Sequence, residues 1–208
     1  MNLQNYYWYF PSVLTPKFCD EVIKYAKMHK EEVGITGFFN NKNNSNKEIK
    51  KLQKKRNSNI VWMRDKWIYK EILPYVEQAN KLAGWNFDWD WSEACQFTKY
   101  STNQHYGWHG DAWNLPYSKR DNLQENGKIR KLSVTCSLSD GSEYTGGELE
   151  FNFNDPETDK KKNIKKCTEI LPRGSIVVFP SFVYHRVTPV KKGTRYSLVI
   201  WNLGYPYR

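Results

Sequence analysis

Apolar and polar residues alternate through much of the second half of the chain. Leu132, Val134, Cys136 and Leu138 are each separated by one residue, a period that predicts a strand over 131–138 with one buried face. Alternation or short apolar runs predict further strands at 92–100, 105–110, the segment Leu149–Phe153 that opens at Gly146-Gly147, 167–171, 174–179, 183–188 and 194–202. Short strands at this spacing indicate a β-sandwich or barrel, and about eight of them fit a jelly roll.

The first half of the chain shows a helical period instead. Thr15-Pro16 resembles an N-cap followed by proline at the first helical position, and apolar residues then recur at helical spacing over 16–31. A second helix is expected over 67–82, kinked at Pro74 and ending near Gly84. We expect both helices to pack against the outside of a sheet.

Shorter elements complete the first half. Residues 7–14 and 59–63 are apolar enough to form strands. Residues 38–57 are rich in Asn and Lys without any period, which predicts a mobile loop that can act as a lid. The whole chain, 1–208, is therefore interpreted as one domain, with residues 1–90 as support and 91–204 as the jelly-roll core. The predicted fold class is mainly β with supporting α-helices packed outside.

Composition bears on membrane insertion, secretion and the redox state of the cysteines. No apolar window of about 18 residues exists, so no membrane span is expected, and the first residues lack the order of a signal peptide. The cysteines are scattered without a CxxC pair, which is typical of reduced, buried thiols in a cytoplasmic protein. They are Cys19, Cys95, Cys136 and Cys167.

The formal net charge of +10 raises the question of a nucleic-acid partner. The excess is concentrated in two polar runs, one between Lys42 and Arg56 and one between Lys160 and Lys166. Such runs most often form solvated loops. An acidic macromolecular substrate and a nucleic acid are the alternatives.

The chemistry that the sequence suggests centres on His109 and Asp111. Residues two apart on a strand point to the same face, so an imidazole and a carboxylate would stand side by side. These are two of the three ligands of the 2-His-1-carboxylate triad that marks non-haem Fe(II) oxygenases. The third ligand must then be a second histidine. Of the remaining three, His29 lies on the polar side of the first helix and His105 lies four residues before His109. His185 is the best candidate, because it begins a distant strand after the turn Pro180-Ser181 and barrel closure brings distant strands together.

Arg195, ten residues after His185, would complete the site. A chelating 2-oxoacid leaves its far carboxylate inside the barrel, where a planar guanidinium can bind it bidentately. Arg195 opposes Tyr196, Leu198 and Ile200 in its alternation. It therefore faces away from them, either into the barrel or towards solvent.

These motifs together resemble a known family. The spacing of Tyr100, Tyr106, His109 and Asp111, then Gly-Gly-Glu-Leu at 146–149, then His185 and Arg195, is similar to Fe(II)/2-oxoglutarate dioxygenases of the prolyl 4-hydroxylase and PKHD-type group. The resemblance is strong over about 90–202. One departure is Asn103, where the family usually has glycine, although asparagine also tolerates left-handed geometry.

The resemblance implies a double-stranded β-helix and a role for each matching residue. His109, Asp111 and His185 would bind Fe(II), Arg195 and Tyr100 would bind 2-oxoglutarate, and Arg130, Tyr106 and Trp201 would contact the substrate. No catalytic residue is expected beyond the metal site. O2 is the other cosubstrate, and ascorbate is a further cofactor that the family suggests.

The resemblance also implies a reaction: hydroxylation of a C–H bond, with a prolyl residue of a protein or peptide as the expected substrate, and with release of succinate and CO2. Two alternatives remain open. One is hydroxylation of a free amino acid or small metabolite. The other is a non-catalytic basic jelly roll that binds RNA or an acidic protein, although the intact metal motif argues against it. Nucleic acid is disfavoured as a substrate, and the sequence leaves the oligomeric state open.

Overall fold

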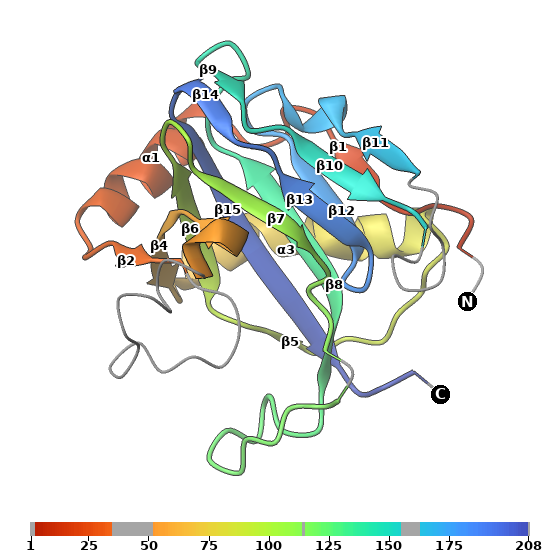
Figure 1. The fold of residues 1–208 in the computed structure, drawn as a ribbon. Coiled ribbons are helices and arrows are strands. Elements are labelled where there is room, and N and C mark those ends of the chain that lie inside the picture. The colour runs from red at the N-terminus through yellow and green to blue at the C-terminus, as the bar shows by residue number, and fades with distance from the viewer. Residues whose placement is uncertain (1–2, 35–51, 114, 155–162, 208) are drawn as a thin grey trace.

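The computed structural model describes residues 3–34, 52–113, 115–154 and 163–207. Within this part, two antiparallel β-sheets face each other (Figure 1). The larger sheet has the order β1 (Trp8–Phe10), β12 (Ile176–Pro180), β8 (Ile129–Ser137), β15 (Arg195–Gly204), β6 (Cys95–Tyr100), β4 (Asn59–Met63) and β2 (Glu32–Val33), and β5 (Trp91–Ser92) also pairs with β15.

The smaller sheet carries the strands that alternate with these in sequence. Its order is β11 (Ile164–Lys166), β10 (Leu149–Asn152), β13 (Tyr184–Val187), β7 (His105–His109) and β3 (Arg56–Asn57). A separate ribbon pairs β9 (Tyr144–Gly146) with β14 (Val190–Gly193). Successive strands that cross between two facing sheets form a jelly roll, so the predicted fold class is confirmed.

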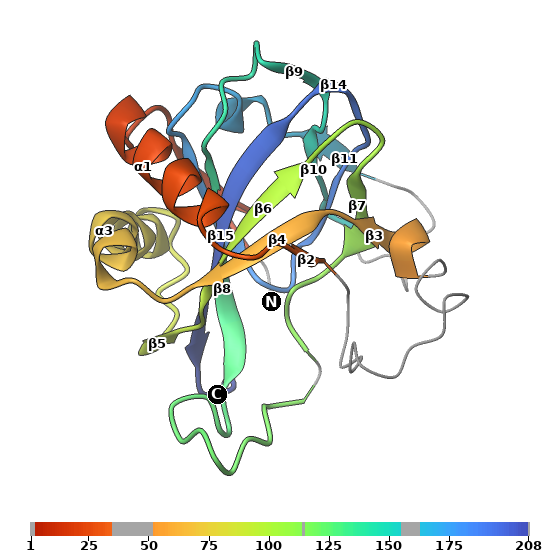
Figure 2. The ribbon, with the colours of Figure 1, turned by 90° about the vertical axis from the view of Figure 1, so that its left-hand side faces the viewer.

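Two helices cover the outer face of the larger sheet (Figure 2). Helix α1 (Pro16–Lys27) begins as predicted, because the Thr15 hydroxyl accepts a hydrogen bond from the Phe18 amide at 3.1 Å. It ends four residues earlier than expected, because its last buried residue is Ala26. Helix α3 (Lys66–Leu82) continues past Pro74, which is exposed to solvent. It ends shortly before Gly84, whose φ of +73° lies in the left-handed region.

The strands of the larger sheet divide their side chains between two cores. On β12, Ile176 and Val178 pack under the helices, whereas Val177 and Phe179 point between the sheets. Phe179 meets Phe151 of the smaller sheet edge-on, with ring centroids 5.1 Å apart. Burial of each large apolar side chain contributes about 1.5–3 kcal/mol, so both cores stabilise the sandwich.

The structure corrects several local predictions. The strand expected at 167–171 is wrong: Thr168–Ile170 form a 3₁₀ turn, because the buried residues Cys167 and Ile170 are three apart. Of the loop expected at 38–57, residues 38–51 lie outside the described residues. Residues 52–55 are helical and Arg56–Asn57 form β3, so that part of the loop prediction is also wrong.

Other predictions agree with the structure. The four cysteines are free and buried. Asn103 adopts φ 67°, the left-handed geometry expected of it. None of the described helices has the length and apolar character needed to cross a membrane.

Candidate active site

Pairing of β7 with β13 brings the two candidate histidines together. His109 lies directly opposite His185 in the register of these antiparallel strands. The two imidazole centroids are 4.2 Å apart. Asp111 follows β7, and its backbone amide donates to the Ser181 carbonyl at 2.8 Å, in the turn that precedes β13. Sheet pairing and one turn therefore hold all three side chains.

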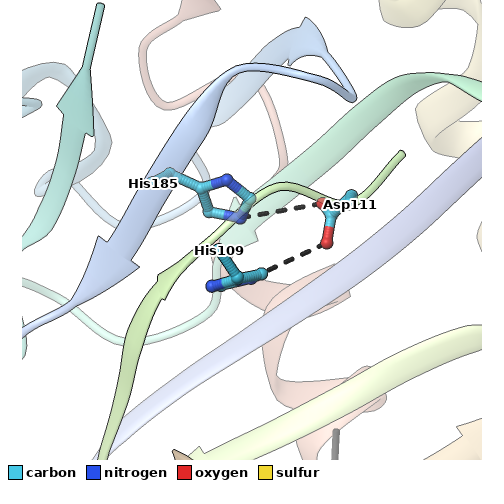
Figure 3. Close-up of side chains that lie close together, drawn as sticks. All are labelled: His109, Asp111 and His185. Carbon is cyan, nitrogen blue, oxygen red and sulfur yellow. Dashed lines mark ion pairs between the residues drawn. The ribbon is translucent and has the colours of Figure 1, made fainter. Parts of the chain in front are cut away.

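The three side chains point at one another (Figure 3). His109 Nε2 lies 3.7 Å from Asp111 Oδ1, and His185 Nε2 lies 3.6 Å from Asp111 Oδ2. All three ligating atoms lie within 4.8 Å of one another, and all three residues are buried. This is the only such cluster of His, Cys, Asp and Glu side chains in the described ranges. His105 instead contacts the Lys54 carbonyl, and His29 that of Tyr25.

Hydrogen bonds prepare the histidines to bind a metal. The Nδ1 atom of His109 lies 2.8 Å from the Gly107 carbonyl, and that of His185 lies 3.0 Å from the Val183 carbonyl. A carbonyl can only accept, so each Nδ1 carries the proton and each Nε2 keeps its lone pair. Burial, followed by the facing His185, lowers the pKa of His109 well below its ordinary value. A neutral imidazole is the form that binds a metal.

Asp111 is held as a carboxylate. Burial by itself would raise its pKa, but the facing His185 and His109 when they carry a proton, then Arg130 and the Ser133 hydroxyl, lower the pKa to about 2. Ser133 donates to Asp111 Oδ2 at 2.7 Å. Two neutral imidazoles and one carboxylate, with the remaining directions open to a cavity, suit a ferrous ion.

That cavity lies between the two sheets, and we call it the barrel cavity. It includes the three candidate metal ligands. Its wall on the larger sheet is largely polar, with Gln96, Thr98 and Tyr100 from β6 and Arg195, Ser197 and Trp201 from β15. Tyr196, Leu198 and Ile200, which alternate with the β15 residues, pack under the helices instead. Arg195 therefore faces the barrel interior, one of the two directions that the sequence left open.

Arg195 fits the anionic end of a 2-oxoacid. Its side chain is 2% exposed, and Nη1 donates to the Ser197 hydroxyl at 3.2 Å. Within the described residues it forms no ion pair with a carboxylate, although a buried charge is normally paired. Tyr100 lies opposite it in the register, with the guanidinium 5.5 Å from the ring centroid. A ligand carboxylate would supply the missing partner.

The residues expected to contact substrate lie around the metal cluster. The Tyr106 ring stacks on His109 with centroids 3.5 Å apart. The Trp201 indole lines the barrel cavity, and its buried Nε1 has no hydrogen-bond partner within the described structure. Arg130 stacks on Trp201 at 4.0 Å and makes a two-pronged ion pair with Glu93 at 2.9 and 2.6 Å. Its charge is therefore already balanced.

Several residues of the cavity were missed from the sequence. Gln96 and Thr98 could have been found, because they alternate with the buried Cys95 and Phe97. Glu93 could not, because its pairing with Arg130 depends on the three-dimensional fold. Arg56 was assigned to a solvated charge run, yet it is buried inside the cavity.

Comparison with known proteins assigns the family. Residues 95–202, just over half of the chain, match the model of the 2OG-Fe(II) oxygenase superfamily. The chain belongs to this superfamily. The match spans the strands that hold all three candidate ligands and Arg195. Fe(II), 2-oxoglutarate and O2 are thus the cofactor and cosubstrates of its family, and the cavity described above has a donor set that fits them.

Sequence relatives of the chain within the superfamily include PKHD-type hydroxylases. A PKHD-type hydroxylase of Synechococcus sp. (strain CC9605) is 38% identical over 105 residues, which is 50% of this chain and 39% of that protein. The PKHD-type hydroxylase YbiX of Escherichia coli O157:H7 is 36% identical over the same length, 50% of this chain and 40% of that protein. The aligned part thus covers about two fifths of these relatives.

Solved structures share the fold across nearly the whole chain. A viral collagen prolyl hydroxylase from Paramecium bursaria Chlorella virus-1 has a TM-score of 0.60 at 20% identity and covers 97% of both chains. A Trichoplax adhaerens prolyl hydroxylase, solved with a peptide fragment of hypoxia inducible factor, has a TM-score of 0.65 at 17% identity, covering 96% of this chain and 84% of that one. At such identities the likeness shows the fold alone.

Proposed function

We propose that this protein is an Fe(II)- and 2-oxoglutarate-dependent dioxygenase that hydroxylates a prolyl residue of a protein or peptide. The observation that carries the proposal is the position of ligating atoms from three buried residues, within 4.8 Å of one another, in the same cavity as Arg195, which has no carboxylate partner among the described residues. The prolyl substrate is supported by the named activities of the structural neighbours, one of which was solved with a peptide.

Each residue of the cavity has a role in this proposal. His109, Asp111 and His185 would hold the ferrous ion, and Arg195 with Tyr100 would bind the far carboxylate of 2-oxoglutarate. When bound, the metal and cosubstrates supply the oxidation that places one oxygen atom on the substrate and the other in succinate, with loss of CO2. The protein contributes orientation and a cavity that excludes bulk water. Tyr106, Trp201 and Arg130 would line the path of the substrate.

The test combines cosubstrate turnover with product analysis. Purified protein is incubated with Fe(II), ascorbate, 2-oxoglutarate and proline-containing peptides, and succinate and peptide masses are measured. We expect succinate to form and a prolyl peptide to gain the mass of one oxygen atom, and His185→Ala to abolish both. Turnover that hydroxylates only non-prolyl substrates would contradict the prolyl assignment. Failure to bind Fe(II) or 2-oxoglutarate would contradict the whole proposal.

A further inference from the structure

A second arginine lies inside the barrel cavity beside the metal cluster. Arg56 comes from β3, the edge strand of the smaller sheet, and its side chain is 5% exposed. Its Nη2 donates to Gln96 on the larger sheet, so the side chain reaches across the cavity. Its Nε donates to the Ser58 hydroxyl at 3.0 Å. Both partners are neutral, and within the described residues Arg56 has no carboxylate partner.

The surrounding backbone leaves room for this side chain and little else. A Cβ atom at Gly34 would lie 2.4 Å from Ser58 Oγ and 2.9 Å from Arg56 Nε. The Gly34 amide also donates to the Ser58 carbonyl at 2.9 Å, which fixes the two segments. A guanidinium has five N–H groups, and the bonds to Ser58 and Gln96 leave three of them without a partner among the described residues, in a side chain that lines the barrel cavity.

The position of Arg56 limits how far its ligand can be from the metal. The guanidinium carbon lies 4.6 Å from the Tyr106 ring centroid, and that ring stacks on His109 at 3.5 Å. The two separations together place Arg56 within about 8 Å of the His109 imidazole, roughly two residues of extended chain. An anionic group bound to Arg56 would therefore lie close to the carbon that is oxidised.

The charges in the cavity do not sum to zero, and one further negative charge would balance them. When bound, Fe(II) and 2-oxoglutarate would bring two positive and two negative charges, which would cancel. Arg130 is balanced by Glu93, and Asp111 balances only one of Arg56 and Arg195. One positive charge remains in a buried site, where an unpaired charge is costly. A substrate with one negative group would neutralise it.

Resting on the Fe(II)- and 2-oxoglutarate-dependent hydroxylation proposed above, whether its substrate is a peptide residue or a free amino acid, we infer that the substrate carries a carboxylate within about two residues of the hydroxylated carbon, and that Arg56 binds this carboxylate. Arg56 is thus a specificity-determining residue, which selects acidic or carboxyl-terminal substrates over neutral ones. The three sources of such a group are a free amino acid, the carboxyl-terminal residue of a peptide and an acidic side chain next to the target residue.

The test uses matched probes that differ only in the carboxylate. The pairs are L-proline and L-prolinamide, Ala-Pro and its amide, and capped peptides with Glu-Pro or Gln-Pro. Binding to the Mn(II)- and 2-oxoglutarate-loaded protein is followed through tryptophan fluorescence, since Trp201 lines the cavity. We expect the carboxylate member of at least one pair to bind roughly tenfold tighter or more, and the pair that responds identifies the source.

Variants separate this role from folding and from cosubstrate binding. Arg56→Gln should remove the preference for the carboxylate probes while leaving the affinity for 2-oxoglutarate unchanged. Arg56→Lys should keep part of this preference, because lysine keeps the positive charge but lacks the planar guanidinium. Arg173→Gln, which removes an arginine paired with Asp20 outside the cavity, should leave both affinities unchanged. If Arg56→Gln does not melt cooperatively, Arg56→Lys carries the comparison.

Three results would overturn the inference. The first is the absence of a carboxylate preference in every pair with the unaltered protein, including no binding of any probe. The second is a preference that survives Arg56→Gln. The third is a loss of 2-oxoglutarate affinity in Arg56→Gln, which would assign Arg56 to the cosubstrate. In each case normal Fe(II) and 2-oxoglutarate binding by the unaltered protein leaves the proposed function standing.

Discussion

The two faces of the larger sheet perform different tasks although they are built from the same strands. On β15, Leu198 and Ile200 pack under the helices, whereas Arg195 and Ser197 line the barrel cavity. The outer face is largely apolar and buried, and it stabilises the fold. The inner face buries polar and charged groups at a cost in stability, because those groups await ligands. Substitutions on the two faces should therefore change different measurements.

The largest effect is expected from the metal cluster between the sheets. Asp111→Ala removes the only carboxylate of the cluster. Loss of a group that merely supports a metal ligand lowers metal affinity by up to roughly 100-fold. Since Asp111 is itself a candidate ligand, we expect its loss to lower Fe(II) affinity by more than that. Anaerobic titration with Fe(II), followed by tryptophan fluorescence, measures this affinity. Equal affinities of the variant and the unaltered protein would remove Asp111 from the metal site.

The next effect concerns the inner face alone. Arg195→Gln should weaken 2-oxoglutarate binding by about 2–5 kcal/mol, the usual loss when one partner of a buried ion pair is removed. The free energy of unfolding without ligand should not fall, because the lost guanidinium has no carboxylate partner in the described structure. Calorimetry and denaturant titration give the two numbers. A large loss of stability with normal binding would reverse the assignment of this face.

The matched change on the outer face should behave in the opposite way. Ile200→Ala leaves a cavity in the fully buried core under the helices and should cost about 2–5 kcal/mol of unfolding free energy. Metal and 2-oxoglutarate affinities of the remaining folded protein should stay within about twofold. A selective loss of either affinity would show that the faces are not independent.

The smallest effect is expected at Ser133, which lies on the inner face of β8 and donates to Asp111. Ser133→Ala should lower Fe(II) affinity roughly tenfold, the lower end for a group that orients a metal ligand. Ser142→Ala, which removes a hydroxyl in an exposed turn, is the control and should leave the affinity unchanged. If the two variants bind Fe(II) equally well, the hydrogen bond to Asp111 does not support the site.

Alternation along single strands explains why much of this arrangement could be predicted. Arg195 and Tyr196 are neighbours on one strand, so their side chains point to opposite faces of the sheet. The two-residue spacing of His109 and Asp111 likewise depends only on one strand and the residues that follow it. His185 was expected as the third ligand from barrel closure and from the family resemblance, whereas the β7–β13 pairing that brings it opposite His109 is seen only in the structure. The prediction of site residues thus depended on local spacing combined with a known pattern.

Features that depend on pairing between distant segments were not predictable. Arg56 follows two lysines and belongs to a strand of only two residues, so its neighbours in sequence gave no sign of burial. Its environment comes from β7, through Tyr106, and from β6, through Gln96. Residues 167–171 were misassigned for a different reason, because a short apolar run fits a strand or a helical turn equally well.

The most direct test of the account is the position of the metal itself. Crystals grown without oxygen, with Fe(II) and 2-oxoglutarate, would be measured at the iron absorption edge. The account predicts one anomalous peak within coordination distance of His109 Nε2, His185 Nε2 and an Asp111 carboxylate oxygen, with the far carboxylate of 2-oxoglutarate on Arg195. Iron bound elsewhere, or 2-oxoglutarate turned away from Arg195, would contradict it.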